Sequence, residues 1–278
     1  MKIIKVINNN NVCVFDNNGK EQIISAKGIG FGKKYGDEIE LNGDFKIYMI
    51  TDSSFRKKLI ESLSEIPYEI IAITDDLVKY ISEHTDGKLN DSLLITLSDH
   101  ISFAIERKKN GMEFSNPLMD SISEYFHDEF ALGKYCLEKI NNTLNIHLSN
   151  DEAGFIAMHI INARLGTKMS QVSDITKFVN DCADIADKCF SGKIDKTSVF
   201  YERFLIHLKF LAKRLFKAEE LPNVLSRDDD ILSLIKLKFK KHYKCAKCMQ
   251  DHILKNYAKT ISEDEMLTLA IHLKRITE

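Results

Sequence analysis

The feature of this sequence that most constrains its fold is an internal repeat between two helical segments. Apolar residues recur at spacings of three and four through both segments, which is the period of amphipathic helices. At an offset of 113 residues, the matching pairs are Phe130 and Tyr243, Lys134 and Lys247, Ile140 and Ile253, Ser149 and Ser262, Asp151 and Asp264, Glu152 and Glu265, Ala157 and Ala270, and His159 and His272. At an offset of 107, the matching pairs are His100 and His207, Phe103 and Phe210, and Arg107 and Arg214. The repeat predicts two related all-α bundles of about five helices each.

Residues 1 to 50 have a different pattern. Four short β-branched or aromatic runs, KIIKVI, VCVF, EQIIS and KIYMI, are separated by turn-forming residues, as in a small antiparallel sheet. Helix-capping residues at 51 to 54 then precede the first helical segment. The chain is therefore predicted to be an α+β multidomain protein, with a sheet domain at residues 1–55 and helical-bundle repeats at 60–168 and 172–278.

Composition excludes several protein classes. The net charge is only -2, so any nucleic-acid signal must be local. The N-terminus lacks the order of a signal peptide, and no apolar run approaches the roughly 20 residues that span a bilayer. Six scattered cysteines in such a chain are typical of reduced thiols. We expect a cytoplasmic protein without a disulfide framework.

The predicted sheet domain concentrates basic charge. Residues 1 to 36 contain six lysines against one aspartate and one glutamate. Asparagines 8 to 11 supply amides that can read base edges, and Phe31 supplies a stacking surface beside Lys27. This composition suits RNA, although the asparagines could instead form turns, Phe31 could be a core residue and the lysines a solvated face. A sheet of this size buries little surface, so we expect a homodimer.

Four of the nine histidines fall at equivalent places in the two repeats: His100 with His207, and His159 with His272. A single histidine on an apolar helix face is usually structural, but two recurring pairs favour a shared chemistry. Neutral imidazole keeps a lone pair that can attack phosphorus, so the four are candidate phosphoryl acceptors. Glu152 and Glu265 are interpreted as parts of capping boxes that begin at Ser149 and Ser262.

Other functions remain as alternatives. Cys245-x-x-Cys248, with His242 and His252 nearby, has metal-ligand spacing, but the first repeat lacks these residues. Standard hydrolase motifs are missing. A phosphotransfer intermediate or enzyme would pass phosphate from the histidines to a substrate. A DNA-binding activator would need a helix-turn-helix in place of the N-terminal sheet.

The whole chain resembles the BglG family of transcriptional antiterminators, most closely its LicT-type members that respond to β-glucosides. The resemblance is carried by KIIKVINNNN and KGIGFGKKYGD near the N-terminus, by LNDSLLITLSDHISFAIER, DEFALGKY and DEAGFIAMHI in the first repeat, and by FLIHLKFLAKRLF and DEMLTLAIHLKR in the second.

This resemblance implies a co-antiterminator domain that dimerises on a leader RNA hairpin, and two regulation domains that the sugar phosphotransferase system phosphorylates. It implies a regulator, not an enzyme, without a cofactor or metal. The sugar permease would phosphorylate His100 and His159 and inhibit, whereas the carrier HPr would phosphorylate His207 and His272 and activate. The implied RNA contacts are Lys5, Asn8, Asn10, Lys27 and Phe31.

Overall fold

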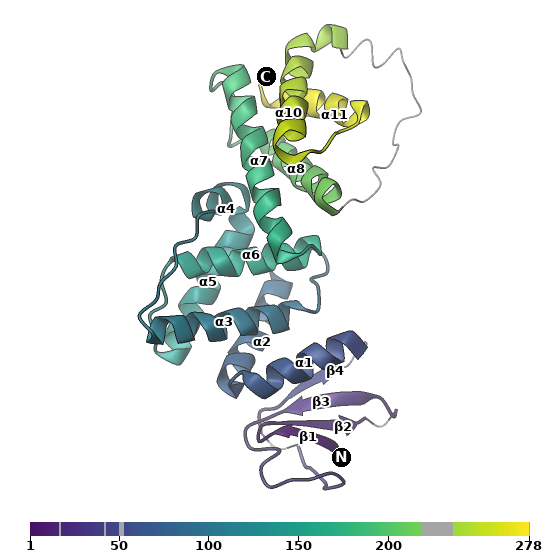
Figure 1. Ribbon diagram of the computed structural model, residues 1–278, viewed down its shortest axis with the longest axis vertical. Helices are drawn as coiled ribbons and strands as arrows, with labels where there is room; N and C mark the ends of the chain where they lie inside the picture. The colour runs from purple at the N-terminus through teal and green to yellow at the C-terminus, as the bar shows by residue number, and fades with distance from the viewer. Residues whose placement is uncertain (17, 42, 50–52, 218–235, 278) are drawn as a thin grey trace. The chain divides into compact units, whose positions relative to one another are not determined.

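The computed structural model describes residues 1–16, 18–41, 43–49, 53–217 and 236–277 (Figure 1). The capping residues expected at 51 and 52 lie outside these ranges. The strands are β1 (Ile3–Asn8), β2 (Asn11–Phe15), β3 (Glu21–Ser25) and β4 (Lys46–Met49). The helices are α1 (Ser53–Glu65), α2 (Tyr68–Glu83), α3 (Leu93–Lys109), α4 (Met119–Tyr125), α5 (His127–Leu144), α6 (Asp151–Leu165), α7 (Met169–Phe190), α8 (Val199–Lys217), α10 (Lys240–Tyr257) and α11 (Glu263–Ile276). None of the described helices is long and apolar enough to cross a membrane.

The four strands form one antiparallel sheet in chain order, as the sequence predicts. Because neighbouring strand residues point to opposite faces, the sheet contributes to two cores. Cys13, Ile23 and Tyr48 join a core shared with helices of the first repeat. Val12 and Ile24, on the other face, pack in a smaller cluster with loop residue Ile39. A sheet followed by helical bundles confirms the predicted fold class (Figure 1).

The chain divides into two compact units. The first contains residues 1–116 and 129–166, and the second contains residues 117–128 and 167–278. In the first unit α3 packs against α6, and in the second unit the equivalent helices α8 and α11 pack against each other. Helix α1 runs across the interval between the first two predicted domains. The domain boundaries themselves remain a prediction.

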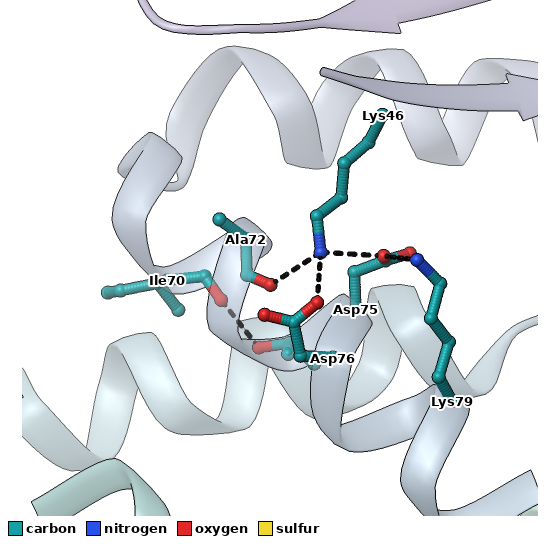
Figure 2. A network of polar contacts seen from close by, with 7 residues as sticks. Lys46, Ile70, Ala72, Asp75, Asp76 and Lys79 are labelled. Carbon is teal, nitrogen blue, oxygen red and sulfur yellow. Dashed lines mark hydrogen bonds and ion pairs between the residues drawn. The ribbon is translucent and has the colours of Figure 1, made fainter. Parts of the chain in front are cut away.

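A cluster of charged groups joins the sheet to the first repeat (Figure 2). Nζ of Lys46 on β4 lies 2.7 Å from Oδ2 of Asp75 and 2.6 Å from Oδ1 of Asp76, both on α2. It also donates to the carbonyl oxygen of Ala72 at 3.0 Å. Burial would lower the pKa of Lys46, but the bonds to the two carboxylates outweigh it and raise that pKa. The protonated lysine therefore ties the edge strand to α2.

Replacing Lys46 with methionine should lower the free energy of unfolding by about 1–2 kcal/mol, because Asp75 is mostly buried and loses its main partner. Lys79 on α2 supplies the matched control, since it lies 3.0 Å from the same Asp75 oxygen but is largely exposed. Lys79→Met should change stability by no more than about 0.5 kcal/mol. Thermal unfolding of the three chains measures both effects, and equal losses would contradict the role given to Lys46.

Candidate functional site

The first histidine cluster lies between α3 and α6. His100 and Arg107 are seven residues apart on α3, and so are Glu152 and His159 on α6, so each pair shares a helix face. Nε2 of His100 lies 2.9 Å from Oε2 of Glu152, and Nη2 of Arg107 lies 2.9 Å from Oε1 of the same carboxylate. The ring centroids of His100 and His159 are 4.9 Å apart. One glutamate therefore joins a histidine to an arginine beside a second histidine.

The second repeat builds the same cluster between α8 and α11. Nε2 of His207 lies 3.2 Å from Oε2 of Glu265, and Arg214 pairs with the other oxygen of that carboxylate. The rings of His207 and His272 are stacked, with centroids 5.0 Å apart and planes inclined by 25°. The structure thus brings together the four histidines of the sequence analysis as two pairs, one in each repeat.

Electrostatics assign different charges to the groups of each cluster. Burial would raise the pKa of Glu152, but its contacts with His100 and Arg107 outweigh it and hold that pKa below the ordinary value. Glu265 behaves in the same way beside His207 and Arg214. The carboxylates are therefore ionised at neutral pH.

Burial, helped by a neighbouring histidine, also lowers the pKa of the second histidine of each pair. It lowers the pKa of His159 to about 3, with His100 as the second cause, and that of His272 to about 4, with His207 as the second cause. Both imidazoles are thus neutral at pH 7 and keep the lone pair that attack on phosphorus requires.

The capping-box interpretation of the two glutamates was wrong in its main part. The Ser262 hydroxyl does accept from the backbone N–H of Glu265, at 3.2 Å. The Glu265 carboxylate, however, faces His207 and Arg214 and does not return to the cap. In the first copy the N-cap is Asn150, without a side-chain hydrogen bond. Glu152 and Glu265 belong to the histidine clusters because the adjoining helix brings a histidine and an arginine to each.

The arginines of the clusters had no role in the sequence analysis, although the repeat aligned Arg107 with Arg214. Their recurrence at equivalent places in the two repeats could have identified them as site residues, and the same holds for the two glutamates. Asp99, in contrast, is exposed on α3, and its counterpart Ile206 is exposed on α8. Neither joins a cluster.

The two histidines of the metal alternative have partners other than its cysteines. Cys245 is buried and Cys248 is exposed. Nε2 of His242 lies 3.0 Å from the hydroxyl of Thr277, and Nε2 of His252 lies 2.9 Å from Oδ2 of Asp181. Within the ranges that the structure describes, no three histidine, cysteine, aspartate or glutamate residues are arranged to hold a metal ion.

The asparagines of the sheet domain build its β1–β2 turn. Oδ1 of Asn8 accepts from the backbone N–H of Asn10 at 2.9 Å, and Oδ1 of Asn10 accepts from the backbone N–H of Gly28 at 2.8 Å. Nδ2 of Asn8 donates to the carbonyl oxygen of Leu63 on α1 at 2.6 Å. The turn interpretation of the asparagines therefore holds, and these bonds fix the turn against the loop that contains Gly28.

That loop presents an aromatic and basic surface. Phe31 is 73% exposed, so it is not a core residue. Lys5 and Lys27 are also exposed. Tyr35, which the sequence analysis did not single out, is 78% exposed, and it follows directly on two lysines. Aromatic faces beside positive charges are suited to stacking on unpaired bases and to contacting phosphates.

The depressed histidine pKa values predict a pH dependence of stability. A histidine with a folded pKa near 3 or 4 and an ordinary value of 6.5 takes up protons more readily in the unfolded chain. The contribution of these neutral histidines to the free energy of unfolding is complete above pH 6.5 and is lost as the pH falls toward 4. For His159 the loss at pH 5 is roughly 1–2 kcal/mol. Glu152 and Glu265, with lowered pKa values, contribute to this loss only below about pH 4.5.

Thermal unfolding between pH 7.5 and 5 measures this dependence, and the His159→Gln variant should give a flatter profile than the native chain. His127 supplies the control, because it is exposed and its Nδ1 contacts only a local carbonyl. His127→Gln should leave the profile unchanged. A His159→Gln profile as steep as the native one would contradict the buried, neutral state of His159.

Comparison with known proteins agrees with this architecture. Residues 1–57 match the CAT RNA binding domain, and residues 75–163 and 178–276 match the PRD domain. The chain is 36% identical over 278 residues to "Transcription antiterminator LicT" of Bacillus subtilis (strain 168), covering 100% of this chain and 99% of that protein. It is 36% identical over 276 residues to "Beta-glucoside operon antiterminator" of Dickeya chrysanthemi, covering 99% and 96%.

A further relative is "Protein GlcT" of Staphylococcus aureus (strain bovine RF122 / ET3-1), at 32% identity over 275 residues, covering 97% of this chain and 95% of that protein. The matches extend over the sheet and over both histidine clusters. The chain therefore belongs to the family of transcription antiterminators that join a CAT RNA-binding domain to PRD domains and are regulated by phosphorylation through the sugar phosphotransferase system.

Proposed function

We propose that this antiterminator binds a leader RNA hairpin as a homodimer, and that His100, His159, His207 and His272 are its phosphorylation sites. The observation that carries the proposal is the recurrence, in both repeats, of a histidine pair with one ion-paired glutamate and arginine. Bound RNA would exclude formation of an overlapping terminator. The controlled genes would be those for β-glucosides, in keeping with the name of the Dickeya relative.

The RNA surface would comprise Lys5, Asn8, Asn10, Lys27 and Phe31. The exposed Phe31 ring offers a stacking face, and the lysines offer phosphate contacts. Asn8 and Asn10 use part of their hydrogen-bonding capacity to hold the turn. Their contribution would therefore combine contact with RNA and positioning of the neighbouring residues.

Phe31→Ala should weaken hairpin binding by about 1–3 kcal/mol without unfolding the protein, because the exposed ring would lose its stacking on a base while no buried core is opened. Gel-shift titration measures the affinity, and circular dichroism verifies the fold. Phe210 is an exposed aromatic residue on α8, so Phe210→Ala is the matched control and should bind normally. Undiminished binding by the Phe31 variant would remove this residue from the RNA surface.

Support for a homodimer comes from the edge strand β4. Phe45, just before it, and Ile47 and Met49 within it alternate along the chain and are 39%, 42% and 50% exposed. β4 is the outer strand of the sheet beside β3, and an apolar row on such an edge strand offers both side chains and backbone groups for association. A second copy would cover this row and complete the RNA-binding domain.

Control would be divided between the two repeats. The sugar permease would phosphorylate His100 and His159 and inhibit, whereas HPr would phosphorylate His207 and His272 and activate. A phosphoryl group carries about -1.5 to -2 charges at pH 7, so it would repel Glu152 or Glu265 and attract the paired arginine. Exchange of the arginine between carboxylate and phosphate would change the packing of the two helices in each cluster.

The histidines would store phosphate as a signal and would not pass it to a substrate, so the protein is not an enzyme in this proposal. Its location would be the cytoplasm, where nascent transcripts and HPr meet. Residues 1–55 would form the RNA-binding domain, and residues 60–168 and 172–278 the two regulation domains. No cofactor is required.

Incubation with phosphoenolpyruvate, enzyme I and HPr, followed by mass-spectrometric mapping of acid-labile phosphate, tests the proposal. Phosphate is expected on His207 and His272, and addition of the permease should extend it to His100 and His159. Absence of phosphate from all four, with an active HPr control, would overturn the assignment of these sites. Steady transfer of phosphate to a small molecule would favour the phosphotransfer enzyme instead.

A further inference from the structure

The two ring nitrogens of His100 are not equivalent, and the same difference recurs in His207. Nε2 of each ring is buried and lies 2.9 Å from Oε2 of Glu152 in the first copy and 3.2 Å from Oε2 of Glu265 in the second. These are close ion-pair contacts in which the ring N–H is not aligned with the oxygen as in a regular hydrogen bond. The side chains nevertheless keep 14% and 16% of their surface exposed. The accessible edge of each ring therefore lies away from Nε2. Two copies with different neighbouring sequences share this orientation.

The carboxylate determines which of the two ring nitrogens keeps a hydrogen. A histidine nitrogen that faces a carboxylate carries the hydrogen, and this contact fixes the tautomer and the ring orientation. With hydrogen on Nε2, the lone pair of His100 and of His207 is at Nδ1. Nδ1 is then both the nucleophilic nitrogen and the one that the glutamate does not cover.

His159 has the reverse arrangement. Its Nδ1 is buried and meets no hydrogen-bond partner in the described part of the chain. A phosphoryl donor cannot reach a nitrogen enclosed by protein, so Nε2 is the available atom of this ring. The two histidines of the first cluster thus present different nitrogens, although their ring centroids are only 4.9 Å apart.

We propose that the phosphoryl group is accepted at Nδ1 of His100 and His207 and at Nε2 of His159, with Glu152 and Glu265 as the positioning residues that select Nδ1. This inference rests on the proposed function, to which it adds the reacting atom and the residue that selects it. The first regulation domain would then carry two different phosphohistidine isomers, and the isomer would record which histidine has been modified.

The transfer balances without a further reactant. The Nδ1 lone pair of His207 attacks phosphorus of a donor phosphohistidine whose ring is protonated, and a new N–P bond forms. The donor N–P bond breaks, and its electron pair returns to the donor nitrogen, which leaves a neutral imidazole. His207 becomes a phosphorylated imidazolium whose Nε2–H faces Glu265, so the carboxylate stabilises the positive charge of the product.

The native full-length chain permits a direct test, because trypsin separates these histidines. His100 lies in the peptide of residues 89–107, His207 in 204–209 and His159 in 140–164. The chain is phosphorylated with phosphoenolpyruvate, enzyme I, HPr and the permease, and is digested under alkaline conditions that preserve both isomers. Isomer-specific phosphohistidine antibodies then sort the peptides, and mass spectrometry identifies them.

The peptides of His100 and His207 should be recovered with the Nδ1-specific antibody, and that of His159 with the Nε2-specific antibody. Recovery of the His207 peptide with the Nε2-specific antibody would overturn the inference and leave the proposed function intact. Absence of phosphate from every peptide would instead overturn the proposed function, and this inference with it.

In a variant experiment, the unchanged first repeat serves as the internal control for the second. Glu265→Gln removes the charge that fixes hydrogen on Nε2 of His207 but leaves the cluster of the first repeat unchanged. The Nε2 isomer should then appear in the peptide of residues 204–209, while the peptide of residues 89–107 keeps the Nδ1 isomer. Glu265→Asp, which retains the carboxylate, should restore part of the Nδ1 selectivity. An unchanged isomer in the Gln variant would show that Glu265 does not select the nitrogen.

Discussion

Replacing Gly30 with alanine should lower the affinity for the RNA hairpin by roughly tenfold or more, equivalent to at least about 1.4 kcal/mol. A Cβ atom on Gly30 would lie 2.2 Å from the backbone carbonyl oxygen of Asn8, and backbone atoms cannot rotate away as a side chain can. The backbone N–H of Gly30 also donates to the carbonyl oxygen of Asn9 at 2.9 Å. The substitution must therefore push apart the β1–β2 turn and the loop that carries Phe31.

Gel-shift titration of the full chain measures the loss of affinity, and circular dichroism reports the helices. Gly111 supplies a matched control, since it occupies a left-handed conformation in the loop after α3, far along the chain from the sheet. Gly111→Ala strains the backbone but has open space for its Cβ atom. It should reduce stability and leave RNA affinity unchanged. Equal affinity of the two variants would contradict the importance of the close contact at Gly30.

This contact illustrates what the sequence can and cannot reveal about the RNA-binding surface. Short β-branched or aromatic runs were sufficient to predict all four strands, because each strand buries at least one of its faces. The lysines and Phe31 could be named as candidates from composition alone. The bond from Asn8 to the Leu63 carbonyl joins residues 55 positions apart. No local pattern predicts such a contact, because it depends on where α1 packs on the sheet.

The histidine clusters show a similar limit. Recurrence identified the four histidines, since a shared chemistry in two copies needs the same residue at the same place. It did not reveal the partners of Glu152, because Ser149, three residues earlier, suggested a local role for that glutamate in a capping box. Pairing with Arg107 requires α3 and α6 to meet, and this meeting of two helices is a tertiary fact. The arginine and the glutamate recur in the same way, but recurrence alone does not show that they form an ion pair with each other.

Replacing Glu152 with alanine should lower the free energy of unfolding by about 3 kcal/mol, because it leaves a mostly buried Arg107 without its ion pair and His100 without its carboxylate. Differential scanning calorimetry should show a fall of several degrees in Tm. Glu138 on α5 is exposed, so Glu138→Ala is the control and should change stability by about 0.5 kcal/mol or less. A similarly small loss in the Glu152 variant would contradict the structural importance of the pair.

Comparison with the second repeat predicts which of the two glutamate variants loses more stability. The side chain of Glu265 is 14% exposed, against 6% for Glu152, and Arg214 is slightly more exposed than Arg107. Water can solvate the groups left behind more readily there, so Glu265→Ala should cost less than Glu152→Ala. Removing Arg107 as well as Glu152, as methionines, should recover part of the loss, because no unpaired charge then remains buried. A double variant as unstable as the sum of the losses in Glu152→Met and Arg107→Met alone would mean that the carboxylate and the guanidinium contribute independently, and the cluster would not act as a unit.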